Sequence, residues 1–237
     1  MPHALTDEMI QEIEQRGGFT ATPEEVTAAR YEATLPTVEE VRCHYPAHVA
    51  RYERAAEVLE RLPVTKHFPV VDAATGVGYG TVVLADLLPS VPEFIALEQN
   101  PVLHWFADMH YMRPRIRRKI ADLERPCMFV EGPAYHLISA LVCIETIEHL
   151  SDPYPLLANA RLHLHSDGLL ILSTPHRPQG SPYHKHEYEL SELEELLEVN
   201  DFDIMSLHVQ EGTRFRGFAR IEDLRGKSIF VVARKKA

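Results

Sequence analysis

The chain has 237 residues, of which 45% are hydrophobic and 25% are charged, so it can bury a full core and fits one α/β domain with an appendage. Its formal net charge of −11, from 35 acidic and 24 basic side chains, argues against a protein that mainly grips a nucleic-acid backbone. The three cysteines lack C-x-x-C spacing and support neither a disulfide framework nor a zinc ribbon. No apolar run approaches a membrane span and no signal pattern opens the chain, so we expect a cytoplasmic protein without a membrane partner.

Three helices are predicted ahead of the first strand. Their patterns cover residues 5–16, 23–33 and 47–61. Gly17 and Gly18 end the first pattern, and Thr22 is a capping residue for the second. We expect this extension, residues 1–65, to cover a cofactor or shape a substrate pocket, or else to pack only on the edge of the sheet.

From residue 68 onward, short apolar runs alternate with helical patterns, which predicts an α/β fold with a parallel sheet and right-handed crossovers. The runs that predict strands are 68–73, 93–98, 127–131, 140–145, 168–174, 202–209 and 228–234. The helical patterns fall near 79–89, 101–112, 153–164 and 190–199. A capping box at Ser191 to Glu194 is expected to begin the last helix. The final two strands should close the sheet as a β-hairpin does.

The first strand runs into the sequence VVDAATGVGYG, residues 70–80, where an apolar run meets a carboxylate and then glycines at every second position. This pattern is typical of a strand, a tight turn and a helix, in which the backbone approaches a ligand and the helix presents free N–H groups to it. The expected ligand is a nucleotide-like cofactor. Similar turns also occur where nothing binds.

Glu98, at the end of the second predicted strand, is a second indication of such a site. It follows the turn by about 20 residues, where a carboxylate can accept hydrogen bonds from both hydroxyls of a ribose. The alternative is an ordinary polar strand end.

Glu145, Glu148 and His149 follow the fourth predicted strand. Their i, i+3 and i+4 spacing places all three side chains on one side if a helical turn begins there. Two carboxylates and an imidazole suit a divalent ion such as Mg²⁺ or Mn²⁺, and a fourth ligand is expected from the loop 181–187 at the same edge of the sheet. Without a metal, Glu145 would line the pocket, Glu148 would cap or pair, and His149 would act as a base.

Five segments, in their order and spacing, resemble class I S-adenosylmethionine-dependent methyltransferases over about residues 45–237: VVDAATGVGYG, FIALEQN, FVEGPAYHL, LVCIETIEHLSDP and GLLILSTPHRP. Residues 145–150 and 173–175 look most like a branch that includes ubiquinone-pathway, sugar and natural-product methyltransferases and small-RNA terminal 2′-O-methyltransferases. The resemblance implies a Rossmann-like sheet of seven strands in the order 3-2-1-4-5-7-6, with strand 7 antiparallel. The corresponding division is a helical extension, 1–65, and a cofactor-binding domain, 66–237.

The resemblance also implies S-adenosylmethionine as the cofactor and a set of residues around it. The set comprises Asp72, Ala74, Thr75, Gly76, Gly78, Tyr79, Glu98, Gln99, Ala134, Tyr135 and Ile144. Within it, Asp72 and the backbone of Ala74 to Gly76 would hold the methionine part, and Glu98 the ribose. As the fourth ligand of a metal at Glu145, Glu148 and His149, the His-x-x-Glu spacing points to His184, with His186 as the alternative.

Three positions depart from the family pattern. Ala74 replaces the first glycine of the turn and narrows the allowed backbone angles. Pro133 stands where many members carry the acid that binds the adenine amino group, so that hydrogen bond would come from elsewhere. Ala140 replaces an acid that is usual just before the apolar run of strand 4.

A basic cluster, Arg113 to Lys119, is expected at the C-terminal end of the helix after strand 2, at the edge of the sheet opposite the cofactor. Cations there suit the helix dipole, so we interpret the cluster as a solvated face rather than a phosphate or RNA site. Arg214, Arg216 and Arg220 would reach a substrate phosphate only if their segment folds over the pocket.

The expected function is O-methylation of a small-molecule hydroxyl of the sugar, catechol or natural-product type. The chain must align the acceptor and remove its proton, with His149 or His184 as the base or with a metal that lowers the hydroxyl pKa. RNA 2′-O-methylation and a non-catalytic cofactor-binding scaffold are the alternatives. A nicotinamide dehydrogenase would leave residues 145–149 and 173–175 without a role. The partner is then a small acceptor molecule, RNA being less favoured, and the oligomeric state is open, a dimer included.

Overall fold

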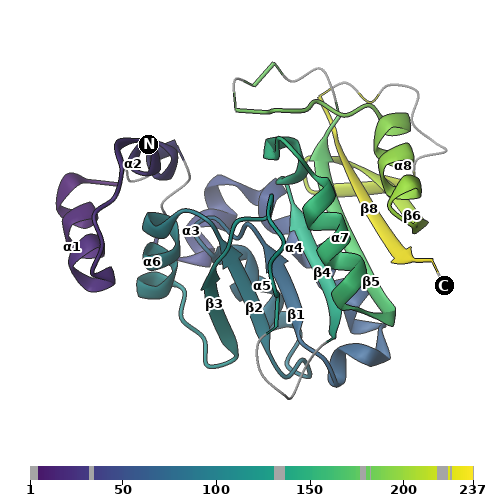
Figure 1. Ribbon diagram of the computed structural model, residues 1–237, viewed down its shortest axis with the longest axis horizontal. Coiled ribbons are helices and arrows are strands. Elements are labelled where there is room, and N and C mark those ends of the chain that lie inside the picture. The colour runs from purple at the N-terminus through teal and green to yellow at the C-terminus, as the bar shows by residue number, and fades with distance from the viewer. Residues whose placement is uncertain are drawn as a thin grey trace.

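The computed structural model describes residues 5–31, 35–130, 137–176, 180–181, 183–217, 224 and 226–236. The described helices are α1 Asp7–Gly17, α2 Pro23–Tyr31, α3 Val38–His44, α4 Pro46–Glu60, α5 Tyr79–Leu87, α6 Pro101–His110, α7 Tyr154–His163 and α8 Leu190–Val199, with 3₁₀ turns at Pro63–Lys66 and Ile147–His149. The described strands are β1 Val70–Ala73, β2 Phe94–Glu98, β3 Ile116–Ile120, β4 Ile138–Ile144, β5 Leu164–Pro175, β6 Phe202–Glu211, β7 Arg214–Gly217 and β8 Ser228–Lys235. Figure 1 shows the strands as one sheet with helices packed against it.

The sheet has eight strands in the order β3-β2-β1-β4-β5-β8-β6-β7. The strands from β3 to β5 pair in parallel, and β8 is antiparallel to both β5 and β6. The predicted order of seven strands, with the last one inserted antiparallel, is therefore confirmed. The short strand β7 adds an eighth at the edge, antiparallel to β6.

Apolar side chains cover both faces of the sheet, as expected of strands that read as continuous apolar runs. On one face, Val71 and Leu141 join the cluster that includes α7 and α8. On the other face, Val70 packs in a cluster with Val49 of α4 and Leu84 of α5. Helix α4 thus shares a core with the sheet, although it lies in the predicted extension.

Helices α1 and α2 pack elsewhere, against α6, in a smaller cluster that contains Ile13, Ala29 and Phe106. They form the part at the left of Figure 1, beyond α6. The division of the chain into 1–65 and 66–237 stays a proposal, because α4 packs with the sheet whereas α1 and α2 pack on α6.

Several helix ends form where the sequence placed them. Thr22 and Glu25 exchange side-chain and backbone hydrogen bonds of 3.2 and 2.7 Å at the start of α2, and Gly18 ends α1 in the left-handed conformation. The predicted cap of α8 is wrong in detail, because the capping box is made by Glu189 and Glu192 rather than by Ser191 to Glu194. Helix α3 was not predicted.

The prediction of strand 3 at 127–131 is wrong. Strand β3 is Ile116–Ile120, paired with β2 from Phe94 to Glu98. Phe129 and Val130 are buried against the sheet without forming a strand. An edge strand needs no continuous apolar run, and basic side chains on it discourage pairing with other molecules, which is why the sequence IRRKI was not recognised.

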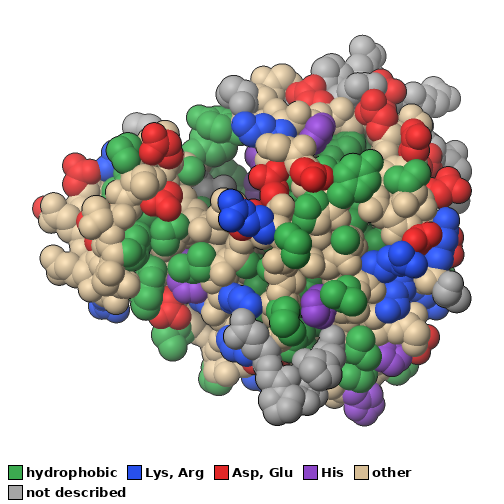
Figure 2. Space-filling model, viewed as in Figure 1, with side chains coloured by type: hydrophobic (Ala, Val, Ile, Leu, Met, Phe, Trp, Pro, Cys, Tyr) green, Lys and Arg blue, Asp and Glu red, His purple; other side chains and the backbone are tan. Residues whose placement is uncertain are grey.

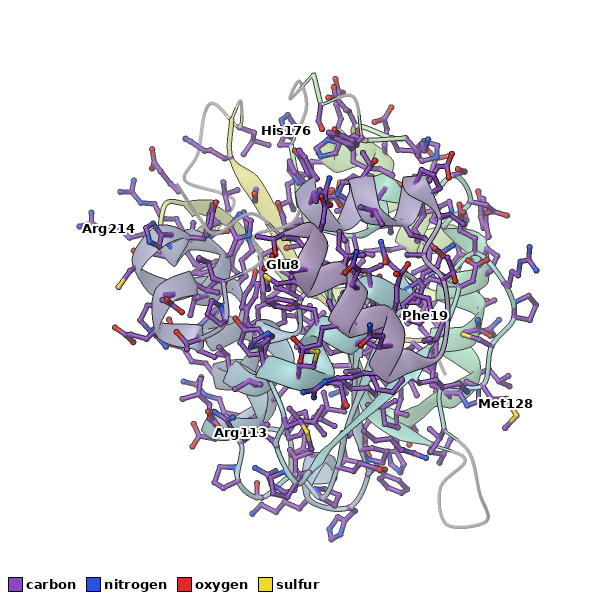
Figure 3. All side chains as sticks on the ribbon, turned by 90° about the vertical axis from the view of Figure 1, so that its left-hand side faces the viewer. Glu8, Phe19, Arg113, Met128, His176 and Arg214 are labelled. Carbon is purple, nitrogen blue, oxygen red and sulfur yellow. The ribbon has the colours of Figure 1, made fainter. Side chains whose placement is uncertain are left out.

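The basic cluster is therefore partly in β3. Arg115 donates to the carbonyls of Ala85, Leu88 and Val91 at the end of α5, at 2.5, 3.1 and 2.6 Å, and Arg113 pairs with a carboxylate of α5. Figure 3 shows Arg113 at the opposite end of the sheet from His176, which follows β5. These contacts give the cluster a role in the fold, in agreement with its expected distance from the cofactor edge.

Candidate active site

The glycine turn lies between β1 and α5. Ala74, Gly76 and Gly78 all have positive φ, at 56°, 53° and 94°. The amide of Gly78 donates to the carbonyl of Thr75 at 2.9 Å. A Cβ on Gly78 would lie 2.7 Å from the Cβ of Ala107, so glycine is needed there for the close packing of α6 against the turn.

Glu98, at the carboxyl end of β2, stabilises this turn by a hydrogen bond. Its Oε2 accepts the amide hydrogen of Gly76 at 2.8 Å, and its Oε1 accepts that of Asn100 at 2.9 Å. The residue is 8% exposed, and burial raises the pKa of its carboxyl, opposed by the backbone hydrogen bonds. The turn and the carboxylate come together as predicted.

Asp72 lies beneath the turn, fully buried. The hydroxyl of Thr81 donates to its Oδ2 at 2.6 Å. Burial raises the pKa of Asp72 to about 7, while this hydrogen bond and the charge of Arg118 oppose the rise. Asp72 does not line either of the two cavities described next, so its position suits support of the turn better than direct contact with a ligand.

Two adjoining cavities open at the carboxyl end of the parallel strands. The Glu98 cavity, about 420 Å³, extends from the turn to Gln99, Leu103, Ala121 and Leu123. The Glu148 cavity, about 470 Å³, extends to the α3–α4 side. The residues that line both are Tyr31, Ala74, Gly76, Glu145 and His149. Figure 2 shows the surface hollowed between the part formed by α1 and α2 and the body of the molecule.

Residues that follow β3 line the Glu98 cavity. Ala121 and Leu123 line it, and Asp122 lies between them. An acid thus follows strand 3 after all, and the expectation based on Pro133 came from the misplaced strand. Pro133, together with the predicted contacts Ala134 and Tyr135, lies outside the described residues.

Glu145 directly follows β4 and has the left-handed conformation, with φ of 49°. The hydroxyl of Ser173 donates to its Oε1 at 2.9 Å, and Arg51 Nη2 lies 3.3 Å from its Oε2. The helical turn that follows, Ile147–His149, is a 3₁₀ turn. Glu145 therefore pairs with Arg51 instead of joining the other predicted metal ligands.

Glu148, His149 and His184 do come together, each with one ligand atom within 4.8 Å of the others. Glu148 is 1% exposed, and Thr174 donates to its Oε2 at 3.0 Å. Its Oε1 is buried and has no hydrogen-bond partner within the described part of the chain. Burial, together with the charge of Glu145, raises the pKa of Glu148.

The orientation of His149 is set by the loop after β5. Its Nδ1 lies 3.1 Å from the carbonyl oxygen of Tyr183, so Nδ1 carries the hydrogen and Nε2 is left as an acceptor. Desolvation lowers the pKa of His149. Amides of Lys185 and His186 donate to the carbonyl of Glu148 and fix this loop. The ring of His186 reaches the carbonyl of Ser151 instead, so His184 is the histidine that joins the cluster.

Comparison with known proteins agrees with this geometry. No protein-family model matches the chain. A probable S-adenosylmethionine-dependent methyltransferase of Mycolicibacterium smegmatis is 28% identical over 208 residues, which cover 84% of this chain and 73% of that protein. A protein of the same description from Mycobacterium tuberculosis is 27% identical, covering 83% and 69%. A putative methyltransferase solved in complex with the Haloferax volcanii Trm112 methyltransferase activator shares the fold, with a TM-score of 0.63 at 12% identity over 84% of this chain and 94% of that one.

The chain is an S-adenosylmethionine-dependent methyltransferase. Its fold is the class I α/β fold, and its cofactor is S-adenosylmethionine. No described helix of this methyltransferase has both the length and the apolar character needed to cross a bilayer.

Sequence reasoning missed the residues that α3 and α4 bring to the methyltransferase site. Tyr45, His48 and Tyr52 line the Glu148 cavity, and the ring of Tyr52 lies edge-on to Tyr79, with centroids 5.8 Å apart. No motif marks these side chains, because they reach the site only through the packing of α4 on α5. One signal was available for Tyr52, since Gly80 lacks the side chain that would collide with its ring.

Proposed function

We propose that this methyltransferase methylates a hydroxyl of a small-molecule acceptor, of the sugar, catechol or natural-product type, bound in the Glu148 cavity. The observation that carries the proposal is the placement of His149, whose Nε2 is left as a proton acceptor at the wall shared by the two cavities. A base must lie within reach of the proton that it removes, and this one faces the space next to the glycine turn.

The lining of the Glu148 cavity favours a small acceptor over RNA. Its walls hold tyrosines and histidines, and no Lys or Arg is among the described residues that line it. Recognition of a nucleic acid relies on cations that contact phosphate. A sugar or a phenol needs no such partner, and aromatic walls pack well against either.

We assign the adenosyl part of the cofactor to the Glu98 cavity. Glu98 suits the ribose hydroxyls, while Leu103, Ala121 and Leu123 offer apolar contact for the base. Asp122 lies between Ala121 and Leu123 but does not line the cavity, and its carboxylate pairs with Arg125 at 3.1 Å, so no described residue is assigned to the adenine amino group. The turn at Ala74 to Gly78, with Ile144 across from it, suits the methionine part.

When bound, the cofactor supplies an electrophilic methyl group on a sulfonium. The protein must align the acceptor oxygen with this methyl group and remove the proton of the acceptor hydroxyl. His149 Nε2 takes the proton, and the carbonyl of Tyr183 keeps the ring in the required tautomer. The walls formed by Tyr45, Tyr52 and Tyr79 exclude water from the acceptor.

A metal-assisted version is the second candidate, because Glu148, His149 and His184 converge and Glu148 Oε1 is buried without a partner among the described residues. One carboxylate and two imidazoles suit Mn²⁺ better than Mg²⁺, which prefers oxygen ligands. A bound ion would lower the pKa of the acceptor hydroxyl. This version gives Glu145 no part as a ligand.

The test is transfer of a tritiated methyl group from S-adenosylmethionine to catechols, simple phenols, sugars and an RNA oligonucleotide. We expect transfer to a small hydroxyl compound, loss of transfer in H149A, and unchanged affinity of H149A for S-adenosylhomocysteine by calorimetry. Cofactor binding without transfer to any acceptor would indicate the scaffold instead, and transfer to RNA alone would contradict the proposal.

Chelation distinguishes the metal-assisted version from the version in which His149 acts without a metal. Dialysis against EDTA should abolish transfer, and Mn²⁺ should restore it, only if the Glu148, His149 and His184 cluster holds an ion. In that case H184A should lose the response to Mn²⁺. Full activity after chelation would leave His149 as an unassisted base.

A further inference from the structure

We infer that Arg51 is a positioning residue of this active site and that it holds the carboxylate of Glu145 where the two cavities meet. Arg51 lies on α4, and Glu145 lies at the end of β4. The inference rests on the proposed function in one respect, because it treats the two cavities as the active site.

Arg51 is a buried cation, with 6% of the residue exposed. Its Nε donates to Gln210 Oε1 at 2.6 Å and its Nη2 to Ser228 Oγ at 3.0 Å, so β6 and β8 hold the guanidinium from behind. Gln210 is itself fixed, because its amide nitrogen donates to the carbonyls of Ala47 and Gly212, both at 2.7 Å. A buried charge is costly unless an opposite charge compensates it.

The compensating charge is Glu145. Its Oε2 lies 3.3 Å from Arg51 Nη2, and the hydroxyl of Ser173 donates to its Oε1 at 2.9 Å. Arg51 Nη1 is buried and has no hydrogen-bond partner among the described residues. The described partners of Arg51 therefore include one carboxylate, that of Glu145. Each charge therefore depends on the other.

The two residues differ in what they face. Glu145 lines both cavities and its side chain is 20% exposed, whereas the side chain of Arg51 is 8% exposed and lines neither cavity. Among the described residues that line the cavities, Glu145 is the ion-pair partner of Arg51, and the charge of Arg51 also acts on Glu148 and His48. The left-handed backbone of Glu145 adds to this reading, because such strain in a residue with a side chain persists where the surroundings fix it, commonly at functional sites.

The consequence concerns the N-terminal helices. Helix α4 precedes the first strand, yet it supplies the cation that fixes a carboxylate at the centre of the site. The arrangement also explains why Glu145 does not join Glu148, His149 and His184, since its carboxylate is already engaged by Arg51 and Ser173.

The experiment compares R51K, R51M, E145Q and the double variant R51M/E145Q in the full chain. The readouts are the affinity for S-adenosylhomocysteine by calorimetry, and kcat and KM with the acceptor found in the methyl-transfer screen. We expect R51M to lower kcat by about 10- to 100-fold while the cofactor affinity changes less than about threefold, and R51K to recover part of the loss. R51M and E145Q should be strongly non-additive, because they remove the same contact.

Arg115 provides a matched control. It is a partly buried arginine fixed by three carbonyls at the other end of the sheet, and R115M should lower the unfolding temperature without changing kcat. Equal effects of R51M and R115M on kcat, or additive effects of R51M and E145Q, would overturn the inference.

A failure of the proposed function would look different. If the wild-type chain transferred no methyl group to any hydroxyl compound, the proposed function would fall. The pairing would still show as non-additive shifts in unfolding temperature for R51M and E145Q, and additive shifts there would overturn the inference as well.

Discussion

At the scale of single residues, two carboxylates hold the glycine turn from opposite sides. Glu98 binds the amide of Gly76 from the cavity side, whereas Asp72 lies beneath the turn and binds Thr81. Both carboxyl groups have raised pKa values because they are buried. Because Glu98 lines a cavity and Asp72 does not, we propose that Glu98 contacts the cofactor and that Asp72 stabilises the turn.

Glu98→Ala should weaken the binding of S-adenosylmethionine by about 1–3 kcal/mol, through the loss of charged hydrogen bonds to the ribose and of the contact that fixes the turn. Calorimetry measures this, with Glu93→Ala as a control, because Glu93 pairs with Arg117 at the far end of β2. An affinity within a factor of two of the wild type would contradict the assignment of Glu98.

Asp72 should make the stability of the fold depend on pH. Its pKa is about 7 in the folded chain against 3.8 for the free group, so between these values the folded state keeps a proton that the unfolded state has lost. Stability therefore falls as pH rises from about 4 to 7 and is then constant, with a total change on the order of 4 kcal/mol from this residue.

Urea unfolding of the wild type and of Asp72→Asn at several pH values between 4.5 and 8 tests this dependence. The asparagine keeps an acceptor for Thr81 but does not titrate, so its stability relative to the wild type should improve as pH rises. A constant difference between the two proteins across this range would mean that Asp72 is ionised in the folded chain throughout.

At the scale of elements, the contact between α4 and α5 shapes the wall of the Glu148 cavity. A Cβ on Gly80 would lie 2.0 to 2.4 Å from ring atoms of Tyr52. The ring of Tyr52 therefore lies directly against the backbone of α5 at Gly80, and Tyr52 forms part of the cavity wall.

Gly80→Ala should destabilise the fold by about 1–3 kcal/mol through overpacking, although alanine is the better helix former by about 1 kcal/mol. It should also raise the acceptor KM, since Tyr52 must move. Chemical unfolding and steady-state kinetics check both effects. Gly217→Ala is the control, because a Cβ there meets nothing within 4 Å.

The elements also show what the sequence could predict and what it could not. Strand β4 is buried along its whole length and reads as an apolar run, so its position was predicted within two residues. Strand β3 lies at the edge and has three basic side chains between two isoleucines, so it has no apolar run. The range 127–131, where Phe129 and Val130 are buried without forming a strand, was predicted in its place. The error concealed Asp122, since the acid was sought after the wrong segment.

The residues of the candidate site also fall into those that the sequence could predict and those that it could not. Residues close together in sequence and tied to strand ends, such as Glu98, Glu148 and His149, were predicted because the ends of parallel strands meet at one edge. Arg51 and Tyr52 were not, because their contacts join segments far apart in the chain. Glu145 does not join the cluster of Glu148 and His149, and the left-handed backbone of Glu145 that accompanies this is not indicated by any spacing rule.

At the scale of the whole molecule, the N-terminal helices contribute in two separate ways. Helix α4 shares the core of the sheet and supplies Arg51, whereas α1 and α2 pack on α6, and α2 contributes to the lining of the cavities. Tyr31 at the end of α2 lines both cavities, and its ring centroid lies 4.2 Å from that of Tyr183 in the loop after β5. The backbone of Tyr183 in turn orients His149.

This contact connects α2 to His149, the proposed base, and we therefore predict a kinetic effect. Tyr31→Ala should remove an aromatic contact worth about 0.5–1.5 kcal/mol and so raise the dissociation rate of S-adenosylhomocysteine by about 2- to 12-fold, with little change in the unfolding temperature. Stopped-flow fluorescence measures the rate. Tyr154→Ala, which removes an exposed tyrosine on α7 away from both cavities, should leave it unchanged. If Tyr31→Ala released the ligand no faster than Tyr154→Ala did, the two rings would merely lie side by side, and α2 would have no part in retaining the cofactor.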